Sequence, residues 1–223
     1  MESCVSSPRP WVTVFATVSL DGRLAPPGVG GYKLSCAEDF ELQHRLRAAY
    51  DAVGVGANTV ILDDPRLTVR LVPGRNPVRV VFDSSLRAPP TARVFQPPGR
   101  RILVTRGGHP RSLLEPYLSR GVEVIEADDT RHALLKLRRR GIRRLLIEGG
   151  GALIASLLEA GVVDEVRVTI APRILGNGPS LARLREGFME VTLALVEVTP
   201  LCGGWVHLVY RVREPKWPCA LPG

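Results

Sequence analysis

Two short segments of this chain carry residue types suited to binding phosphate and handling protons. The first is a glycine run, Glu148-Gly149-Gly150-Gly151, which follows an apolar stretch and opens a helix-like one. Without Cβ atoms, successive backbone N–H groups can turn toward one anion, and the N-terminus of the following helix adds partial positive charge. We therefore expect a phosphate cradle formed by Gly149, Gly150 and Gly151 and guarded by Glu148. An ordinary strand-to-helix turn can also carry glycine, and the spacing is not Gly-x-Gly-x-x-Gly.

The second segment, at residues 59–70, combines hydroxyls, carboxylates and guanidinium groups in one loop after a predicted strand. In an open α/β sheet, ligands bind at this edge. A phosphate requires a cation, a sugar hydroxyl requires a carboxylate acceptor, and a ring requires an apolar wall. The expected residues are Arg70 or Arg47 for the cation, Asp63 for the acceptor and Leu67 for the wall. Asp63-Asp64-Pro65 is equally compatible with a plain helix stop and Asx turn.

The hydrophobic pattern indicates the elements that position both segments. Apolar runs that alternate with helical periodicity predict an α/β fold with a mostly parallel central sheet, helices on both faces and an antiparallel C-terminal edge. The expected strands are 11–18, 51–56, 78–82, 101–105, 122–125, 145–148, 162–168, 191–198 and 205–212. The expected helices are 35–49, opened by a capping box at Ser35-Cys36-Ala37-Glu38, then 57–62, 111–120, 130–140 and one ended by Gly161.

Composition narrows the function classes. The chain has 223 residues, of which 45% are hydrophobic and 23% charged, and we expect a leader at 1–8, one domain at 9–213 and a tail at 214–223. No apolar run is long enough to cross a bilayer and no export signal is evident, so a cytoplasmic protein without membrane contact is expected. The four cysteines and four histidines lack metal-ligand spacing, which predicts no metal. The net charge of +8 suits phosphates, but the scarcity of aromatic residues argues against nucleic acid.

Several motifs occur together and in order along nearly the whole chain. They are Ser19-Leu20-Asp21-Gly22-Arg23, Leu46-Arg47, the string from Gly56 to Arg70, Pro77-Val78-Arg79, Asp83-Ser84, Glu148-Gly149-Gly150 and Ala171-Pro172. In these features the chain resembles the riboflavin-biosynthesis pyrimidine reductase family. The resemblance implies a dihydrofolate-reductase-like fold, a homodimer, and NADPH-dependent reduction of a ribosyl side chain to ribityl on a phosphorylated pyrimidine.

The resemblance also implies roles for individual residues. It places Thr59, Asp63, Ser84 and the turn at 149–153 around NADPH, and it places Arg47, Leu67, Arg70 and Glu148 around the substrate. Ser84 and Arg87, which follow the strand at 78–82, are expected to meet the 2′-phosphate of the cofactor. Lys33 stands where relatives often have an aromatic residue or arginine. Asp63 is expected to orient a ribose hydroxyl, Glu148 to bond the pyrimidine edge, and one of these two carboxylates to assist proton transfer.

The zinc-deaminase signature that accompanies this reductase in bacterial members is absent here. By resemblance to the archaeal and fungal form, the expected substrate is 2,5-diamino-6-(ribosylamino)pyrimidin-4-one 5′-phosphate, before deamination. The alternatives are the deaminated 5-amino-6-(ribosylamino)uracil 5′-phosphate, dihydrofolate, a non-catalytic NADPH sensor and a basic nucleic-acid binder. These alternatives are distinguished by whether NADPH absorbance is lost when each candidate substrate is added.

Overall fold

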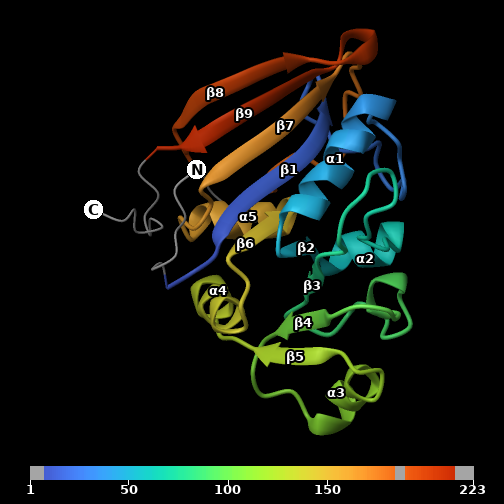
Figure 1. Cartoon of the computed structure of the whole chain (residues 1–223), viewed down its shortest axis with the longest axis vertical. Helices are drawn as coiled ribbons and strands as arrows, with labels where there is room; N and C mark the ends of the chain where they lie inside the picture. The colour runs from blue at the N-terminus through green and yellow to red at the C-terminus, as the bar shows by residue number, and fades with distance from the viewer. Residues whose placement is uncertain (1–7, 184–188, 214–223) are drawn as a thin grey trace.

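The computed structural model describes residues 8–183 and 189–213, and within them nine strands form one sheet in the order β5-β4-β3-β2-β6-β1-β7-β9-β8 (Figure 1). The strands are β1 (Trp11–Ser19), β2 (Ala52–Gly56), β3 (Val78–Phe82), β4 (Arg101–Thr105), β5 (Glu123–Glu126), β6 (Arg144–Ile147), β7 (Glu165–Ala171), β8 (Leu193–Pro200) and β9 (Val206–Val212). The helices are α1 (Ala37–Ala49), α2 (Ala57–Asp63), α3 (Arg111–Leu118), α4 (Thr130–Arg139) and α5 (Gly151–Glu159). Apart from residue 8, the predicted leader and the tail at 214–223 lie outside the described residues.

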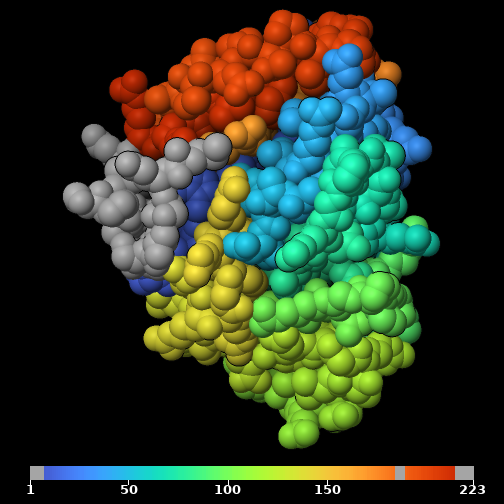
Figure 2. Space-filling view, in the orientation of Figure 1, coloured from blue at the N-terminus to red at the C-terminus, as the bar shows by residue number. Residues whose placement is uncertain are grey.

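The sheet has the mixed character that the sequence predicts. Strands β1 to β7 pair in parallel, and the β8–β9 hairpin adds two antiparallel strands beside β7. Apolar side chains of α4 and α5 pack in a core on one face, whereas those of α1, α2 and α3 pack in a second core on the other. This confirms the α/β class with helices on both faces. Figure 2 shows the β8–β9 hairpin in red at one end of the molecule, next to the blue surface that contains α1.

Most predicted elements are present, with ends shifted by a few residues. The predicted capping box is wrong: Cys36 is the N-cap of α1 and its side chain makes no capping bond. The Ser35 hydroxyl instead bonds Thr17 on β1, and the Glu38 carboxylate accepts the backbone N–H of Cys202 in the hairpin turn. Tertiary partners thus replace the local bonds that the motif would make.

The strands after Gly161 also begin later than expected. Val162 and Val163 are fully buried but precede β7, which starts at Glu165, and the last two strands lie at 193–200 and 206–212. Apolarity alone does not distinguish a buried connection from a paired strand. Within residues 8–183 and 189–213, none of the helices is both long and apolar enough to span a membrane.

A buried ion pair fixes the start of β1 against β7. The guanidinium of Arg9 donates two hydrogen bonds of 2.7 Å to the carboxylate of Asp164, and the side chains of both residues are almost completely buried. The same carboxylate accepts the backbone N–H of Val12 at 2.7 Å. Both carboxylate oxygens are therefore satisfied, as a charge removed from water requires.

The substitution Asp164→Asn tests this anchor. The free energy of unfolding should fall by about 3 to 5 kcal/mol, because a buried guanidinium loses its charged acceptor. Urea unfolding followed by circular dichroism measures the change. As a control, Glu115→Gln removes an exposed carboxylate 3.8 Å from Arg111 and should change stability by less than about 0.5 kcal/mol. Equal effects of the two substitutions would contradict the anchoring role.

Candidate active site

The glycine turn lies where β2 and β6 end side by side. The two strands pair in parallel, and the backbone N–H of Glu148 donates to Gly54 across them at 3.0 Å. Gly149 and Gly150 then adopt φ values of +133° and +84°, which residues with a Cβ rarely adopt, and α5 begins at Gly151. The turn therefore leaves the sheet and enters the helix in a conformation that needs glycine.

The amides of this turn are free to bind an anion. No hydrogen bond between described residues uses the backbone N–H of Gly149, Gly150, Gly151, Ala152 or Leu153 as its donor. A Cβ on Gly150 would lie 3.4 Å from the Thr59 hydroxyl and 3.5 Å from the backbone of Gly56, so this position is already closely surrounded. Free amides at a helix N-terminus, with a hydroxyl beside them, fit the diphosphate of a dinucleotide.

Glu148 and Arg47 form a second buried ion pair. The Nε and Nη2 atoms of Arg47 each donate to a different Glu148 oxygen at 2.6 Å, and Nη1 donates to the Thr68 carbonyl at 3.0 Å. Burial alone lowers the pKa of Arg47, but the charge and hydrogen bonds of Glu148 outweigh it and raise the pKa. Gln43 on α1 donates to the same carboxylate at 3.0 Å. The ion pair thus links the glycine turn, α1 and residues 64–70, which we call the arginine-rich loop.

The arginine-rich loop is held in an unusual backbone conformation. Leu67 is only 2% exposed and has φ of +53°, so its side chain packs in the core while the backbone turns sharply. His44 on α1 accepts the Arg70 backbone N–H on Nδ1 at 2.9 Å. Burial, followed by the charges of Arg47 and Arg70, lowers the pKa of His44 to about 4. His44 is therefore neutral near pH 7, as an acceptor must be.

Guanidinium groups gather around Arg70. Its partial burial is the first cause that lowers its pKa, and three positive neighbours lower it further. These neighbours are Arg47, Arg66 and Arg93. In the described parts of the chain Arg66, Arg70 and Arg93 form no ion pair with a carboxylate. Such a concentration of unneutralised positive charge is suited to a phosphate group.

Asp63 ends α2 and faces a cavity of about 320 Å³. One of its carboxylate oxygens accepts the backbone N–H of Gly31 at 2.6 Å, which ties the loop before α1 to the site. Thr17, Lys33, Ser35 and Gln43 line the same cavity, which we call the site pocket. The second oxygen of Asp63 has no partner among the residues described.

Ser84 and Arg87 lie apart from these groups, in the exposed turn after β3. Asp83 organises this turn by accepting the backbone N–H groups of Ser85 and Ala88. The ring of His109 contacts the Ser84 carbonyl at 3.0 Å. Since β2 and β3 are parallel neighbours, the turn follows the strand next to the one that leads to Thr59.

Some site residues were not predicted from the sequence. Gln43 and His44 precede the predicted Arg47 by about one helical turn, so that helical spacing could have indicated Gln43 as a neighbour on its face. His44 gave no signal, because its role depends on contact with a loop 26 residues away. Arg66 was counted among the guanidinium groups of the loop but given no role. Arg93 was missed, because it reaches the site only through tertiary packing.

Comparisons with known proteins agree with this geometry. Residues 10–207 match the family model described as the RibD C-terminal domain. The chain is 45% identical over 177 residues to the 2,5-diamino-6-ribosylamino-4(3H)-pyrimidinone 5′-phosphate reductase of Methanothermobacter thermautotrophicus, covering 76% of this chain and 81% of the relative.

Solved structures extend the comparison to the fold. Acinetobacter baumannii RibD superposes with a TM-score of 0.83 at 25% identity, covering 95% of this chain and 60% of the RibD chain. Dihydrofolate reductase from Enterococcus faecalis has a TM-score of 0.55 at 13% identity, with 92% of this chain and 97% of the other covered. The dihydrofolate-reductase-like fold is thereby confirmed.

The pKa of His44 predicts how stability changes with pH. The unfolded chain protonates this histidine near pH 6.5 and the folded chain near 4, so the unfolded state binds more protons between these values. The free energy of unfolding should therefore fall as pH drops through this window, by at most about 1.4 kcal/mol per pH unit. The substitution His44→Asn keeps an acceptor but does not titrate, and should reduce the loss. The urea midpoints of both proteins at pH 7.5, 6 and 5 provide the measurement. An equal loss of stability in the two proteins would contradict the prediction.

Proposed function

This chain belongs to the RibD C-terminal domain family of riboflavin-pathway reductases, and we propose that it reduces the ribosylamino side chain of 2,5-diamino-6-(ribosylamino)pyrimidin-4-one 5′-phosphate to ribitylamino with NADPH. One observation carries the proposal. The Glu148–Arg47 pair joins a turn with free amides to a loop rich in unpaired arginines. A dinucleotide and a phosphorylated sugar can therefore bind side by side.

The cofactor is assigned to the β2, β3 and β6 ends. The amides of residues 149–153 and the Thr59 hydroxyl bind the diphosphate, and Ser84 with Arg87 binds the 2′-phosphate. The free amides and the closeness of the Thr59 hydroxyl to Gly150 support this assignment. When bound, the nicotinamide of NADPH supplies a hydride.

The substrate is assigned to the arginine-rich loop and the site pocket. Arg70, with Arg66 and Arg93 beside it, binds the 5′-phosphate, and Leu67 supports the loop from the core. Binding the remote phosphate positions the sugar carbon that is to be reduced. Lys33 lines the site pocket and contributes a further positive charge there.

The two carboxylates have different surroundings, which suggests different roles. Asp63 is exposed and has an oxygen available, so it orients a ribose hydroxyl near the reacting carbon. Glu148 is buried and both its oxygens already accept bonds from Arg47. Glu148 therefore meets the pyrimidine edge as part of an ion pair, and its charge is compensated before substrate binds.

We also propose that two copies of this chain form a homodimer. The outer edge of β8 has no neighbouring strand in the described sheet, and Leu195, Val196 and Val198 on it are each more than half exposed. An apolar edge strand of this kind is suited to pairing with a second copy.

A phosphorylated substrate does not cross membranes, which favours a cytoplasmic enzyme.

The decisive experiment mixes purified protein with NADPH and one candidate substrate at a time and follows absorbance at the NADPH band. We expect oxidation with the diamino ribosylaminopyrimidinone phosphate, and little with its deaminated form or with dihydrofolate. Oxidation only with the deaminated form would correct the substrate. NADPH binding without any oxidation would instead support a sensor.

The substitution Gly150→Ala tests the cradle. A Cβ there should raise the NADPH dissociation constant by about tenfold or more, since the methyl group would contact the Thr59 hydroxyl that is proposed to bind the diphosphate. Gly141→Ala is the matched control, because Gly141 has φ of +88° against +84° and open space around it. Both variants should lose about 1 kcal/mol of stability from backbone strain. Fluorescence titration of NADPH distinguishes them, and equal dissociation constants would argue against the cradle.

The substitution Arg70→Ala tests the phosphate site. The KM for the pyrimidine substrate should rise about 10- to 100-fold, as expected for a lost charge-assisted hydrogen bond, while NADPH affinity stays the same. Arg139→Ala, at the exposed end of α4, removes the same charge without an effect. Steady-state kinetics with a separate NADPH titration provides the measurement. A selective loss of NADPH binding would reverse the two assignments.

A further inference from the structure

Two cysteine side chains meet where α1 begins. Cys36 is the N-cap of α1, and Cys202 lies in the turn between β8 and β9, residues 201–205, which we call the hairpin turn. Both cysteines are free thiols, and Cys202 is exposed whereas Cys36 is partly buried. Their sulfur atoms are close enough for a hydrogen bond between the two thiols. The fold thus brings together two oxidisable groups that are far apart in the sequence.

Two hydrogen bonds hold this contact in place, one on each side of Cys36. The backbone N–H of Cys202 donates to the Glu38 carboxylate at 2.9 Å, and the indole N–H of Trp205 donates to the Leu34 carbonyl at 2.9 Å. A backbone hydrogen bond of 2.8 Å between the first and last residues of the hairpin turn closes the turn itself. Because the two bonds flank Cys36, the thiols stay close together as long as both bonds are kept.

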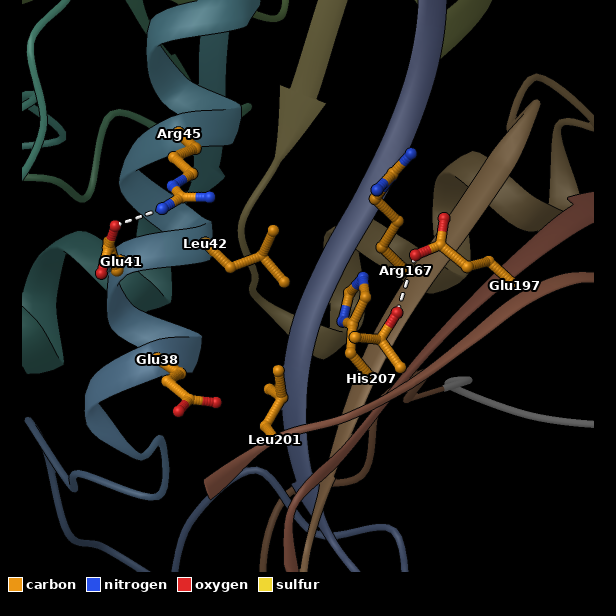
Figure 3. Close-up of a pocket in the computed structure, with 9 residues that line it drawn as sticks. Glu38, Glu41, Leu42, Arg45, Arg167, Glu197, Leu201 and His207 are labelled. Carbon is orange, nitrogen blue, oxygen red and sulfur yellow. Dashed lines mark hydrogen bonds and ion pairs between the residues drawn. The ribbon is translucent and has the colours of Figure 1, made fainter.

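The two cysteines lie beside one end of a second pocket. This pocket, of about 310 Å³, is lined by residues of α1 and of the strands on the C-terminal side of the sheet (Figure 3). In Figure 3, Glu38 on α1 and Leu201 of the hairpin turn face each other at the lower end of the pocket. The helix and the hairpin are therefore separated along the pocket and joined beside the cysteines.

The segment just before Cys36 lines the site pocket. Lys33, Leu34 and Ser35 all belong to the wall of that pocket, together with Asp63. Leu34 is also the residue whose carbonyl binds the hairpin turn. A covalent bond at Cys36 therefore acts on backbone that forms one wall of the site pocket.

The two thiols differ in how readily they react. Burial raises the pKa of Cys36, and the neighbouring thiol of Cys202 raises it further. A thiol with a raised pKa forms less of the thiolate that attacks a disulfide. Because Cys202 is exposed, a dissolved oxidant reaches its sulfur first. Cys202 is thus suited to attack the oxidant, and Cys36 is suited to resolve the product.

We propose that Cys36 and Cys202 form a reversible disulfide that fastens the hairpin turn to the start of α1, with oxidised glutathione or a similar small disulfide as the oxidant. The inference does not depend on the proposed function, because it concerns a bond within the protein. The disulfide fixes one wall of the site pocket against the C-terminal side of the sheet. The state of that wall then follows the thiol–disulfide balance around the protein.

The oxidation balances over two exchange steps. Cys202 loses its proton and attacks one sulfur of oxidised glutathione, which forms a mixed disulfide and releases one glutathione. Cys36 then loses its proton and attacks the Cys202 sulfur, which forms the bond between the two cysteines and releases the second glutathione. The two cysteines lose two electrons in total, and the oxidant gains both electrons together with the two thiol protons.

The bond demands little change of the chain and stabilises it. The sulfurs are already close, and rotation of the two side chains about their Cα–Cβ bonds can bring them together while the backbone stays in place. Closing so long a loop restricts the unfolded chain, which favours the folded state. Disulfides of cytosolic proteins are usually transient or redox-sensing, and a bond that glutathione makes and breaks is of this kind.

Mapping the disulfides of the unmodified protein tests the pair. The protein is equilibrated with reduced and oxidised glutathione, its remaining thiols are alkylated, and it is digested without a reductant. Mass spectrometry should find the peptides of Cys36 and Cys202 joined, and dithiothreitol should separate them. Complete alkylation of Cys36, or a bond that joins it to Cys4, to Cys219 or to a second copy of the chain, would overturn the proposal.

Two single substitutions test the roles of the two thiols. In Cys36→Ser the resolving thiol is missing, so Cys202 should remain joined to glutathione. In Cys202→Ser the exposed thiol is missing, and the fraction of Cys36 joined to glutathione after the same time should be about tenfold lower. Equal modification of Cys202 and Cys36 in these two variants would contradict the assigned order of attack.

Comparing the oxidised and reduced protein measures the effect on the fold. Oxidation should raise the Tm by about 5 to 10 °C and slow hydrogen exchange of the backbone amides at 33–36 and 201–205. The amides of α4, which lines neither pocket, should exchange equally in both states. Cys36→Ser treated with the same oxidant should show neither change. An oxidised protein with the Tm and exchange rates of the reduced one would refute the fastening. None of these measurements requires turnover, so failure of the proposed function and failure of the disulfide are observed separately.

Discussion

The buried ion pair between Arg47 and Glu148 is the constraint on which the rest of the site depends. Its partners are 101 residues apart in sequence, and each belongs to a different part of the site. Removing two charges from water is unfavourable unless they bond each other closely and their remaining polar atoms find partners. Gln43 and the Thr68 carbonyl provide those partners, so the pair is stable only when the glycine turn, α1 and the arginine-rich loop are all in place.

The same logic explains how a basic loop can stay folded. Arg66, Arg70 and Arg93 repel one another, and this repulsion would favour an open loop. Three kinds of contact oppose it: the Leu67 side chain is buried in the core, the His44 ring accepts the Arg70 amide, and Asp64 accepts the Arg93 amide at 2.7 Å. The loop therefore presents its charges from a fixed backbone. Such a loop favours anions whose shape matches the arrangement of the guanidinium groups over anions that are attracted by charge alone.

The C-terminal hairpin extends the sheet and also brings polar groups to α1. Because β7 and β9 pair antiparallel while β1 and β7 pair in parallel, Thr17, Thr169 and His207 occupy one level of the sheet. The helix that covers them contributes a buried carboxylate, and the two threonines satisfy it. A change of register by one residue would turn the row to the other face and leave Asp39 without donors. Strands from the C-terminal side of the sheet thus help to satisfy a buried carboxylate of α1.

The sequence by itself determined the elements and the two segments that we propose to bind ligands. Hydrophobic periodicity located the strands and helices, since burial of one face is a local property of spacing, and it identified the α/β class with its antiparallel edge. The tight turn at Gly149 and Gly150 could be predicted, because the backbone freedom of glycine does not depend on distant contacts. The grouping of Asp63, Leu67 and Arg70 was likewise visible, because all lie within one short loop.

Only the tertiary structure decided which of these residues meet one another. The sequence suggested that Arg47 and Glu148 each face a ligand, but it could not indicate that they bond each other, because that contact requires the order of β2, β6 and α1. It predicted a capping box from local spacing, whereas Ser35 and Glu38 bond partners on β1 and in the hairpin turn. The contacts of His44, Asp39 and His207 could not be predicted for the same reason: a side chain's partners depend on strand register and packing, which join residues that are far apart in the sequence.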